Sequence, residues 1–290
     1  MTTEPRFEHA GVRYGVRCWG DRSANSGSSA YGAPLVLVHG FAQSVASWDE
    51  VAGRLARDRA VYALDLVGHG RSDRPDSPQV YALHAQAEAL LAFISAVSDG
   101  EGGRESRKPA VIGYSLGGRV ALAAAVRDPQ AFAALVLESA GLGPANARER
   151  AAARERDAAQ AMRLRTEGLT AFMDAWERLP LFATQSDLPA AVRERVRAGR
   201  LANDAEALAR TFEGAGQHAM PSRPEALAAL ASMCESGAPV LYLAGARDAK
   251  YCILAEGLAS NGVCETRIIE GAGHNVHLEA PGDFVASLRV

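Results

Sequence analysis

The stretch VIGYSLGGRVALAAAV, residues 111–126, decides the fold class of this chain. It begins with β-branched and apolar residues, as a buried strand does, and ends in an alanine-rich run typical of a helix. Between them, GYSLG at 113–117 fits G-x-S-x-G, which marks a sharp turn from strand to helix. Glycine is needed on both sides of Ser115 because the crowded backbone leaves no room for a β-carbon. We therefore expect Ser115 to be exposed at a strand end, beside a helix N-terminus that attracts anions.

Further apolar runs alternate with alanine-rich amphipathic stretches along the chain. These runs begin at Leu35, Val61, Ala134, Pro239 and Thr266. The alternation is typical of βα units, which build a mostly parallel sheet with helices on both faces. The predicted fold class is α/β, with the functional residues at the carboxyl ends of the strands.

The pattern changes between residues 142 and 220, where strand-like runs disappear and the sequence becomes helical and rich in arginine. Because the strand pattern resumes at Pro239, we interpret 142–220 as a helical cap inserted into one α/β core made of residues 1–141 and 221–290. Two stretches rich in serine, glycine and charge begin at Ser23 and Ser98, and we expect both to be surface loops.

Composition narrows the class of protein. The 290 residues are 48% hydrophobic and 22% charged, as in globular proteins, and the net charge of -3 gives no strong field toward nucleic acid or an anionic membrane. No run approaches a membrane span, and the polar N-terminus lacks the apolar core of a secretory signal. The four cysteines are scattered without metal-ligand spacing. We expect a cytoplasmic protein without a zinc site, whose oligomeric state the sequence does not indicate.

A serine hydroxyl acts as a base or nucleophile only when a histidine takes its proton and an acid orients that histidine. On strand-turn-helix folds with this serine motif, the order along the chain is serine, acid, histidine. Asp248 follows the apolar run PVLYLAG, and His274 follows the next run in the glycine-rich turn GAGH. The predicted triad is therefore Ser115, Asp248 and His274.

Other residues compete for the acid and histidine roles. His277 lies three residues after His274 but starts the expected last helix, so His274 is favoured. Asp248 has an alternative role as a turn or helix-capping residue, and Asp283 lies further downstream. Asp65 also ends a strand, but it precedes the serine and opens a glycine-rich turn, where an aspartate more commonly accepts backbone donors.

An anion formed beside the serine needs two backbone donors, an arrangement called an oxyanion hole. The amide of Leu116, directly after the serine, is one candidate. The turn HGF at 39–41 follows an apolar run and offers the Phe41 amide as the second, unless it is only a strand-end turn. His39 in that turn is expected to be structural.

Several motifs occur in an order that resembles the alpha/beta-hydrolase superfamily. They are HGF at 39–41, DLVGHGRSD at 65–73, GYSLGG at 113–118, GARD at 245–248 and GAGHNVHLEAP at 271–281. The chain more closely resembles the 2-succinyl-6-hydroxy-2,4-cyclohexadiene-1-carboxylate synthases of menaquinone biosynthesis. That resemblance is carried by GYSLGGR at 113–119 and by the cap segments at 137–157, 166–183 and 195–214.

The resemblance implies a lyase that removes a proton from 2-succinyl-5-enolpyruvyl-6-hydroxy-3-cyclohexene-1-carboxylate and releases pyruvate. In that family the triad serine serves as the base, and arginines bind the carboxylates of the substrate. Matching the motifs implies that Arg119 and Arg200 are two of these arginines and that Tyr114 and Trp176 are aromatic site residues.

Two positions depart from the family pattern. Ala153 stands where the family carries a cap arginine, so Arg154, or Arg150 one turn earlier, is expected to take that role. Glu177 follows Trp176 where an aromatic residue is expected.

Three functions remain open from the residues alone. A lyase and a serine hydrolase of esters or carbon-carbon bonds would use the same triad, and a non-catalytic small-molecule receptor would need none. Several convergent guanidinium groups favour a polycarboxylate ligand over a neutral ester, because guanidinium binds carboxylates in a bidentate manner. No cofactor is expected, because the chain has neither a phosphate-binding glycine motif nor a metal-ligand cluster.

Overall fold

The computed structural model describes residues 5–20, 33–98 and 107–288. Within them, eight strands form one sheet in the order β1-β2-β4-β3-β5-β6-β7-β8. The strands are β1 (Arg6–His9), β2 (Val12–Trp19), β3 (Leu35–Val38), β4 (Val61–Leu64), β5 (Ala110–Tyr114), β6 (Ala134–Glu138), β7 (Val240–Gly245) and β8 (Glu265–Ile269). All neighbours from β4 to β8 are parallel, so the predicted sheet is confirmed. Most of the two predicted serine-glycine loops, residues 21–32 and 99–106, lies outside the described residues.

The first two strands, β1 and β2, were not among the strands predicted from the sequence. β1 and β2 pair antiparallel with each other, and β2 pairs antiparallel with β4 at the edge of the parallel sheet. The signal in β2 is that buried Val12, Tyr14 and Val16 recur at every second position, with Arg13 and Gly15 between them, as in a strand with one covered face.

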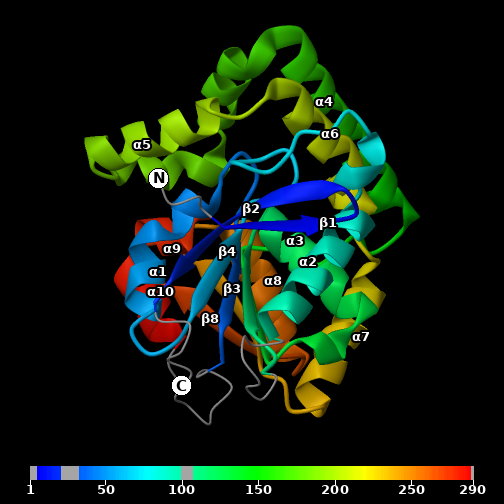
Figure 1. Cartoon of the computed structure of the whole chain (residues 1–290), viewed down its shortest axis with the longest axis vertical. Coiled ribbons are helices and arrows are strands. Elements are labelled where there is room, and N and C mark those ends of the chain that lie inside the picture. The colour runs from blue at the N-terminus through cyan, green and yellow to red at the C-terminus, as the bar shows by residue number, and fades with distance from the viewer. Residues whose placement is uncertain (1–4, 21–32, 99–106, 289–290) are drawn as a thin grey trace.

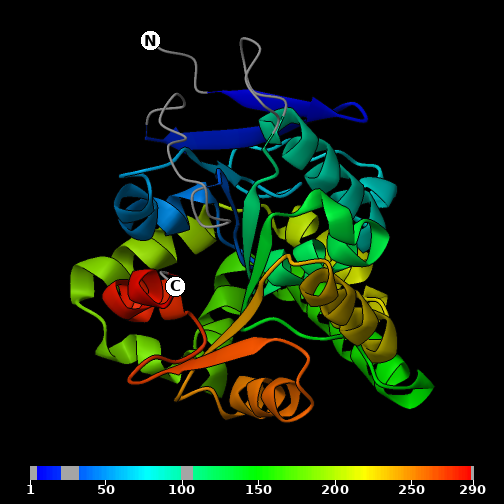
Figure 2. The same ribbon diagram turned by 90° about the horizontal axis from the view of Figure 1, so that it is seen from below.

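Helices cover both faces of the sheet (Figures 1 and 2). One face packs against α1 (Asp49–Leu55) and α10 (Pro281–Ser287). The other packs against α2 (Leu83–Ser98), α3 (Leu116–Arg127), α7 (Arg223–Glu235) and α8 (Ala249–Ser260). Because both faces are covered, the central strands β3 and β5 are buried at every residue and read as unbroken apolar runs.

A group of helices lies between β6 and β7 in the chain and sits above the sheet in Figure 1. It comprises α4 (Ala147–Trp176), α5 (Ala190–Leu201), α6 (Ala205–Ala215) and the 3-10 helices η5 (Pro180–Asp187) and η6 (Gln217–Ala219). Its own apolar cluster contains Leu164, Phe172 and Phe212, and Ala42 from the turn after β3 belongs to the same cluster. These helices therefore pack onto the end of the sheet where the parallel strands finish.

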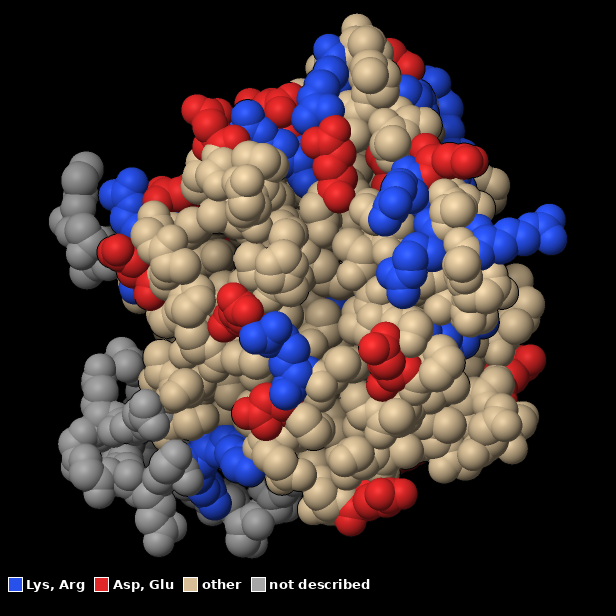
Figure 3. All heavy atoms as spheres, turned by 90° about the vertical axis from the view of Figure 1, so that its right-hand side faces the viewer, with Lys and Arg blue, Asp and Glu red and all other residues tan. Residues whose placement is uncertain are grey.

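Charges on these helices are paired across the surface. Arg165 of α4 binds Glu206 of α6 at 2.8 Å and also Glu213. On the face seen in Figure 3, side chains of both signs are interspersed over the upper end. Among the described helices, none is long and apolar enough to cross a membrane.

Candidate active site

Ser115 sits at the turn between β5 and α3, in a backbone conformation that residues other than glycine rarely adopt. Its φ is 49° and its ψ is -103°. A β-carbon at Gly113 would meet the backbone of Gly118, and one at Gly117 would overlap the carbonyl of Val38. Both glycines of the motif are thus required by close backbone approach, and the turn leaves Ser115 partly exposed.

A continuous chain of hydrogen bonds joins Ser115, His274 and Asp248. The Nδ1–H of His274 donates to Asp248 Oδ2 at 2.7 Å, and Ser115 Oγ lies 3.1 Å from His274 Nε2. Because a carboxylate can only accept, it fixes the proton on Nδ1 and leaves Nε2 free to accept from the serine. Asp248 and His274 are 6% and 1% exposed, so water does not compete for this bond. The arrangement can withdraw a proton through Ser115.

The contacts distinguish the predicted acid and histidine from the alternatives. Asp248 precedes α8, but its side chain makes no capping hydrogen bond there. His277 donates from its backbone N–H and from Nδ1 to Glu138, at 3.0 and 2.7 Å, and its ring stacks on Trp48. Asp283 is exposed on α10.

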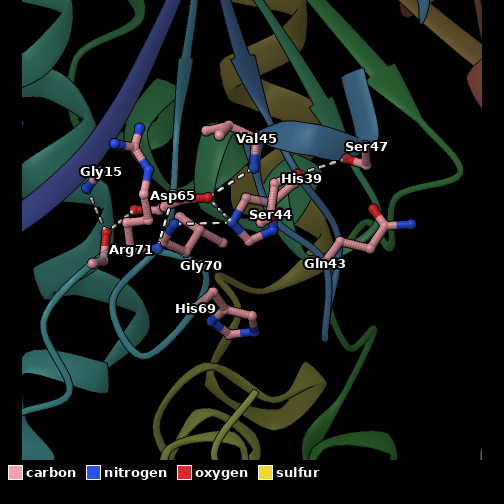
Figure 4. Close-up of polar contacts among 12 residues, drawn as sticks. Gly15, His39, Gln43, Ser44, Val45, Ser47, Asp65, His69, Gly70 and Arg71 are labelled. Carbon is pink, nitrogen blue, oxygen red and sulfur yellow. Dashed lines mark hydrogen bonds and ion pairs between the residues drawn. The ribbon is translucent and has the colours of Figure 1, made fainter. Parts of the chain in front are cut away.

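Asp65 is wholly buried and holds two turns together (Figure 4). Its carboxylate accepts from the amide of Val45 at 2.7 Å and from the amide of Arg71 at 2.9 Å. His39 beside it donates from Nδ1 to the Gly40 carbonyl at 2.8 Å and accepts from the Leu66 amide at Nε2, 3.0 Å away. Burial lowers the pKa of His39 to about 4, so this ring is neutral near pH 7 and serves as a brace.

The two amides expected to stabilise an anion lie at facing turns. Leu116 is the first residue of α3, where the backbone N–H has no partner within the helix. Gly117, next to it, packs against the carbonyls of Val38 and His39, which lead into the turn that carries Phe41. Neither amide donates to another described residue. This packing brings the two predicted donors to the same end of the sheet as the serine.

Aromatic side chains from the helices above the sheet and from the turn after β3 form a cluster next to the triad histidine. Phe41 lies with its ring centroid 4.4 Å from that of Phe212 and 5.2 Å from that of Trp176. Trp176 is 5.7 Å from Phe182, which is 5.8 Å from His274. The predicted Trp176 therefore belongs to an aromatic cluster that reaches the triad histidine through Phe182.

Tyr114 is placed differently from Trp176. Its side chain is 3% exposed and lies between the sheet and the turn at 39–41, with its ring 5.4 Å from His274 and 5.0 Å from His277. A β-carbon at Gly40 would meet its ring. Tyr114 thus packs beside the triad histidine as a residue of the core.

The predicted arginines divide into two groups. Arg119, one turn after the serine, is partly buried and donates to the Ala215 carbonyl at 2.9 Å, and burial lowers its pKa. Arg200 is 5% exposed and lies with its guanidinium carbon 5.1 Å from the Phe182 ring. Arg200 thus contacts a ring that also neighbours His274, whereas the hydrogen bond of Arg119 joins α3 to α6.

The structure does not bring either candidate from α4 to the triad. Arg154 is exposed, because the neighbouring Ala153 faces the interior and Arg154 lies about 100° further around the helix. Arg150 donates to the carbonyls of His218 and Met220, which ties α4 to η6. The expectation that one of them binds substrate thus has no contact to support it. Elsewhere among the described residues, no three His, Cys, Asp or Glu side chains gather as metal ligands.

Residues 35–288 match the model of the family described as alpha/beta hydrolase. The chain belongs to the alpha/beta hydrolase family. A Bacillus subtilis (strain 168) protein, provisionally named 2-succinyl-6-hydroxy-2,4-cyclohexadiene-1-carboxylate synthase, is 34% identical over 278 residues, which are 94% of this chain and 92% of that protein. The synthase of that name from Salmonella agona (strain SL483) is 34% identical over 259 residues, covering 89% and 93%. The family resemblance stated from the motifs is confirmed.

A solved structure of this family supports the same placement. The structure of MenH from S. aureus superimposes with a TM-score of 0.81 at 25% identity, covering 94% of this chain and 96% of that one. The alpha/beta hydrolase fold expected from the sequence is therefore confirmed.

Two residues of this alpha/beta hydrolase site are missing from the sequence-based set. The Tyr251 ring lies 4.9 Å from that of His274, and burial raises the pKa of Tyr251 to about 12, so its hydroxyl stays protonated. The Phe182 ring lies 5.8 Å from the same histidine ring. The sequence offers one signal for Tyr251. It lies three residues after Asp248 on a helix, so its side chain is on the same face as Asp248 and near the carboxyl ends of the strands. For Phe182, which lies in a 3-10 helix, no periodic pattern gives its direction.

Proposed function

We propose that the protein is a lyase that converts 2-succinyl-5-enolpyruvyl-6-hydroxy-3-cyclohexene-1-carboxylate into 2-succinyl-6-hydroxy-2,4-cyclohexadiene-1-carboxylate and pyruvate. The observation that carries the proposal is the 34% identity to the synthases of that product along about the whole chain, with the serine motif and cap segments included. The fold and triad alone would equally suit a hydrolase.

The proposed reaction is a 1,4-elimination. His274 Nε2 takes the proton of Ser115 as the serine oxygen removes the ring proton next to the succinyl ketone. The electron pair of that C–H bond forms a ring double bond, the existing double bond shifts, and the bond to the enolpyruvyl oxygen breaks. The leaving group takes up a proton and becomes pyruvate. Asp248 stabilises the imidazolium that forms, through its 2.7 Å bond to Nδ1.

Charge that develops on the ketone oxygen needs fixed donors. The Leu116 and Phe41 amides are proposed for this role, since neither has another partner among the described residues. We propose Arg119 and Arg200 as the groups that bind carboxylates, because Arg119 lies one helical turn after Ser115 and Arg200 is buried against the Phe182 ring that neighbours His274. A substrate that carries several carboxylates fits such a site better than a neutral ester does.

Pyruvate release coupled to lactate dehydrogenase, run beside hydrolysis of p-nitrophenyl acetate, tests the proposal. We expect rapid pyruvate formation with weak ester cleavage, and loss of pyruvate formation in Ser115→Ala. Rapid ester cleavage without pyruvate would contradict the lyase and place the protein among the serine hydrolases. Loss of neither activity in Ser115→Ala would contradict a catalytic triad of any kind.

A further inference from the structure

Arg200 is a buried cation that donates hydrogen bonds to two side chains of the chain itself. Its Nη1 donates to Glu177 Oε1 at 3.1 Å, and its Nη2 donates to Gln185 Oε1 at 2.9 Å. A buried guanidinium is stable only when a counter-charge balances it. Glu177 supplies that charge, and it stands where the family pattern calls for an aromatic residue.

This ion pair lies close to the triad. The Arg200 guanidinium packs on one side of the Phe182 ring, and that ring lies 5.8 Å from the ring of His274. The positive charge of Arg200 also reaches Tyr114, where it opposes the effect of burial on the tyrosine pKa. One aromatic ring, that of Phe182, therefore contacts the Arg200 guanidinium and also neighbours the triad histidine.

A cavity of about 720 Å³ opens between η5 and α5 at this ion pair. Its walls include four arginines but only two acidic residues, Glu177 and Glu194; the arginines are Arg178, Arg193, Arg197 and Arg200. Gln185, which is 8% exposed, also lines it, and its Nε2 has no partner among the described residues. A carboxylate ligand would meet both the guanidinium and this free amide donor.

Glu177 has a second cationic partner, Arg197, which would still balance its charge if Arg200 bound another carboxylate. Arg197 donates to Glu177 Oε2 at 2.7 Å and to Asp174 at 2.6 Å. If Glu177 released Arg200, its charge would still be balanced by Arg197, and an incoming carboxylate would balance Arg200. The exchange would leave no buried charge unpaired.

We propose that Glu177 is a specificity-determining residue, which occupies at Arg200 the place that a carboxylate of the substrate takes on binding. The proposal rests on the proposed function for the identity of the substrate. Glu177 then competes with the substrate, so it weakens binding of polycarboxylates and discriminates against ligands without a carboxylate at that position.

The test compares Glu177→Gln with the wild type. The glutamine keeps the shape and an acceptor for Arg200 but removes the competing charge. We expect the KM for the enolpyruvyl substrate to fall about tenfold, the size of one charge-assisted hydrogen bond, with the change in KM and not in kcat. Asp174→Asn is the matched control, because it removes the other carboxylate on Arg197 and leaves the Arg200 pair intact. Its KM should equal that of the wild type.

Binding of tricarballylate, a non-reacting tricarboxylate, measured by calorimetry gives a readout that does not need turnover. We expect tighter binding in Glu177→Gln, and no such gain when Arg200→Gln is also present. Unchanged or weaker binding in Glu177→Gln, or an equal gain in Asp174→Asn, would overturn the proposal. Glu177→Ala serves the same comparison if the glutamine variant does not fold.

The two proposals fail separately. Absence of pyruvate release by the wild type would overturn the lyase, while the response of tricarballylate binding to Glu177→Gln would still decide the exchange at Arg200.

Discussion

The two buried aspartates at strand ends, Asp65 and Asp248, should respond to substitution in opposite ways. Asp65→Ala removes the acceptor of two backbone amides, the buried one of Val45 at 2.7 Å and the partly buried one of Arg71 at 2.9 Å. Each donor left without a partner costs about 1–3 kcal/mol, so the free energy of unfolding should fall by about 2–6 kcal/mol. Because a domain has only about 5–15 kcal/mol in total, the folded state should survive but be clearly weakened.

Asp248→Asn should instead impair turnover. The substitution keeps the size of the side chain but removes the charge that stabilises the imidazolium of His274, so kcat should fall by about 10⁴. Its free energy of unfolding should stay within about 1–2 kcal/mol of the wild type, since the amide oxygen can still accept from Nδ1.

Guanidinium denaturation, followed by tryptophan fluorescence, measures the first effect, and pyruvate release below the unfolding transition measures the second. Equal m-values are needed for the comparison, because a change in m would mean that the denatured or native state had changed in compactness. A stable Asp65→Ala variant without turnover would refute the reasoning, because Asp65 would then act in turnover and not in stability.

Three further outcomes are expected. Ser115→Ala should lower kcat by about 10⁴ or more while calorimetry shows tricarballylate binding unchanged; weakened binding with residual turnover would argue against the serine as base. Arg119→Ala should raise KM about 10- to 100-fold with a smaller effect on kcat, because a charge-assisted contact is lost; an unchanged KM would make Arg119 a brace for Ala215 only. Burial lowers the pKa of His39 to about 4 and that of His69 to about 3, against an ordinary value of 6.5, so the unfolded chain binds more protons below about pH 6.5. The free energy of unfolding should fall as pH drops from about 6.5 toward 4, by up to about 1.4 kcal/mol per pH unit for each histidine; urea titrations at pH 7, 6 and 5 check this, and His39→Gln should flatten the dependence.

The central strands and the turn at Ser115 could be predicted from the sequence, because the interactions that determine them are local. Strands covered on both faces must be continuously apolar, and a crowded turn must carry glycine. β2, at the edge of the parallel sheet, was not predicted. Its apolar residues recur only at every second position over a short stretch, so they form no continuous apolar run.

The site residues expected on α4 were harder to predict, because the direction of a side chain on a helix depends on how that helix packs. Arg150, Ala153 and Arg154 lie within five positions on α4, yet the first donates to the carbonyls of His218 and Met220, the second is buried and the third is exposed. Spacing gives their relative angles around the helix but not which angle faces the site. The arginine-rich composition thus indicates an anionic ligand without identifying the arginine that meets it.

The residue types at positions 177 and 200 can be understood only as a pair, because their side chains form an ion pair. An arginine that is 5% exposed needs a carboxylate, and the helix that carries Trp176 ends with one at the next residue. An aromatic residue at position 177 would leave Arg200 without that counter-charge and would make a bound anion more valuable to the folded state. The departure at 177 therefore changes the balance between stability without ligand and affinity for ligand, because the same guanidinium serves both.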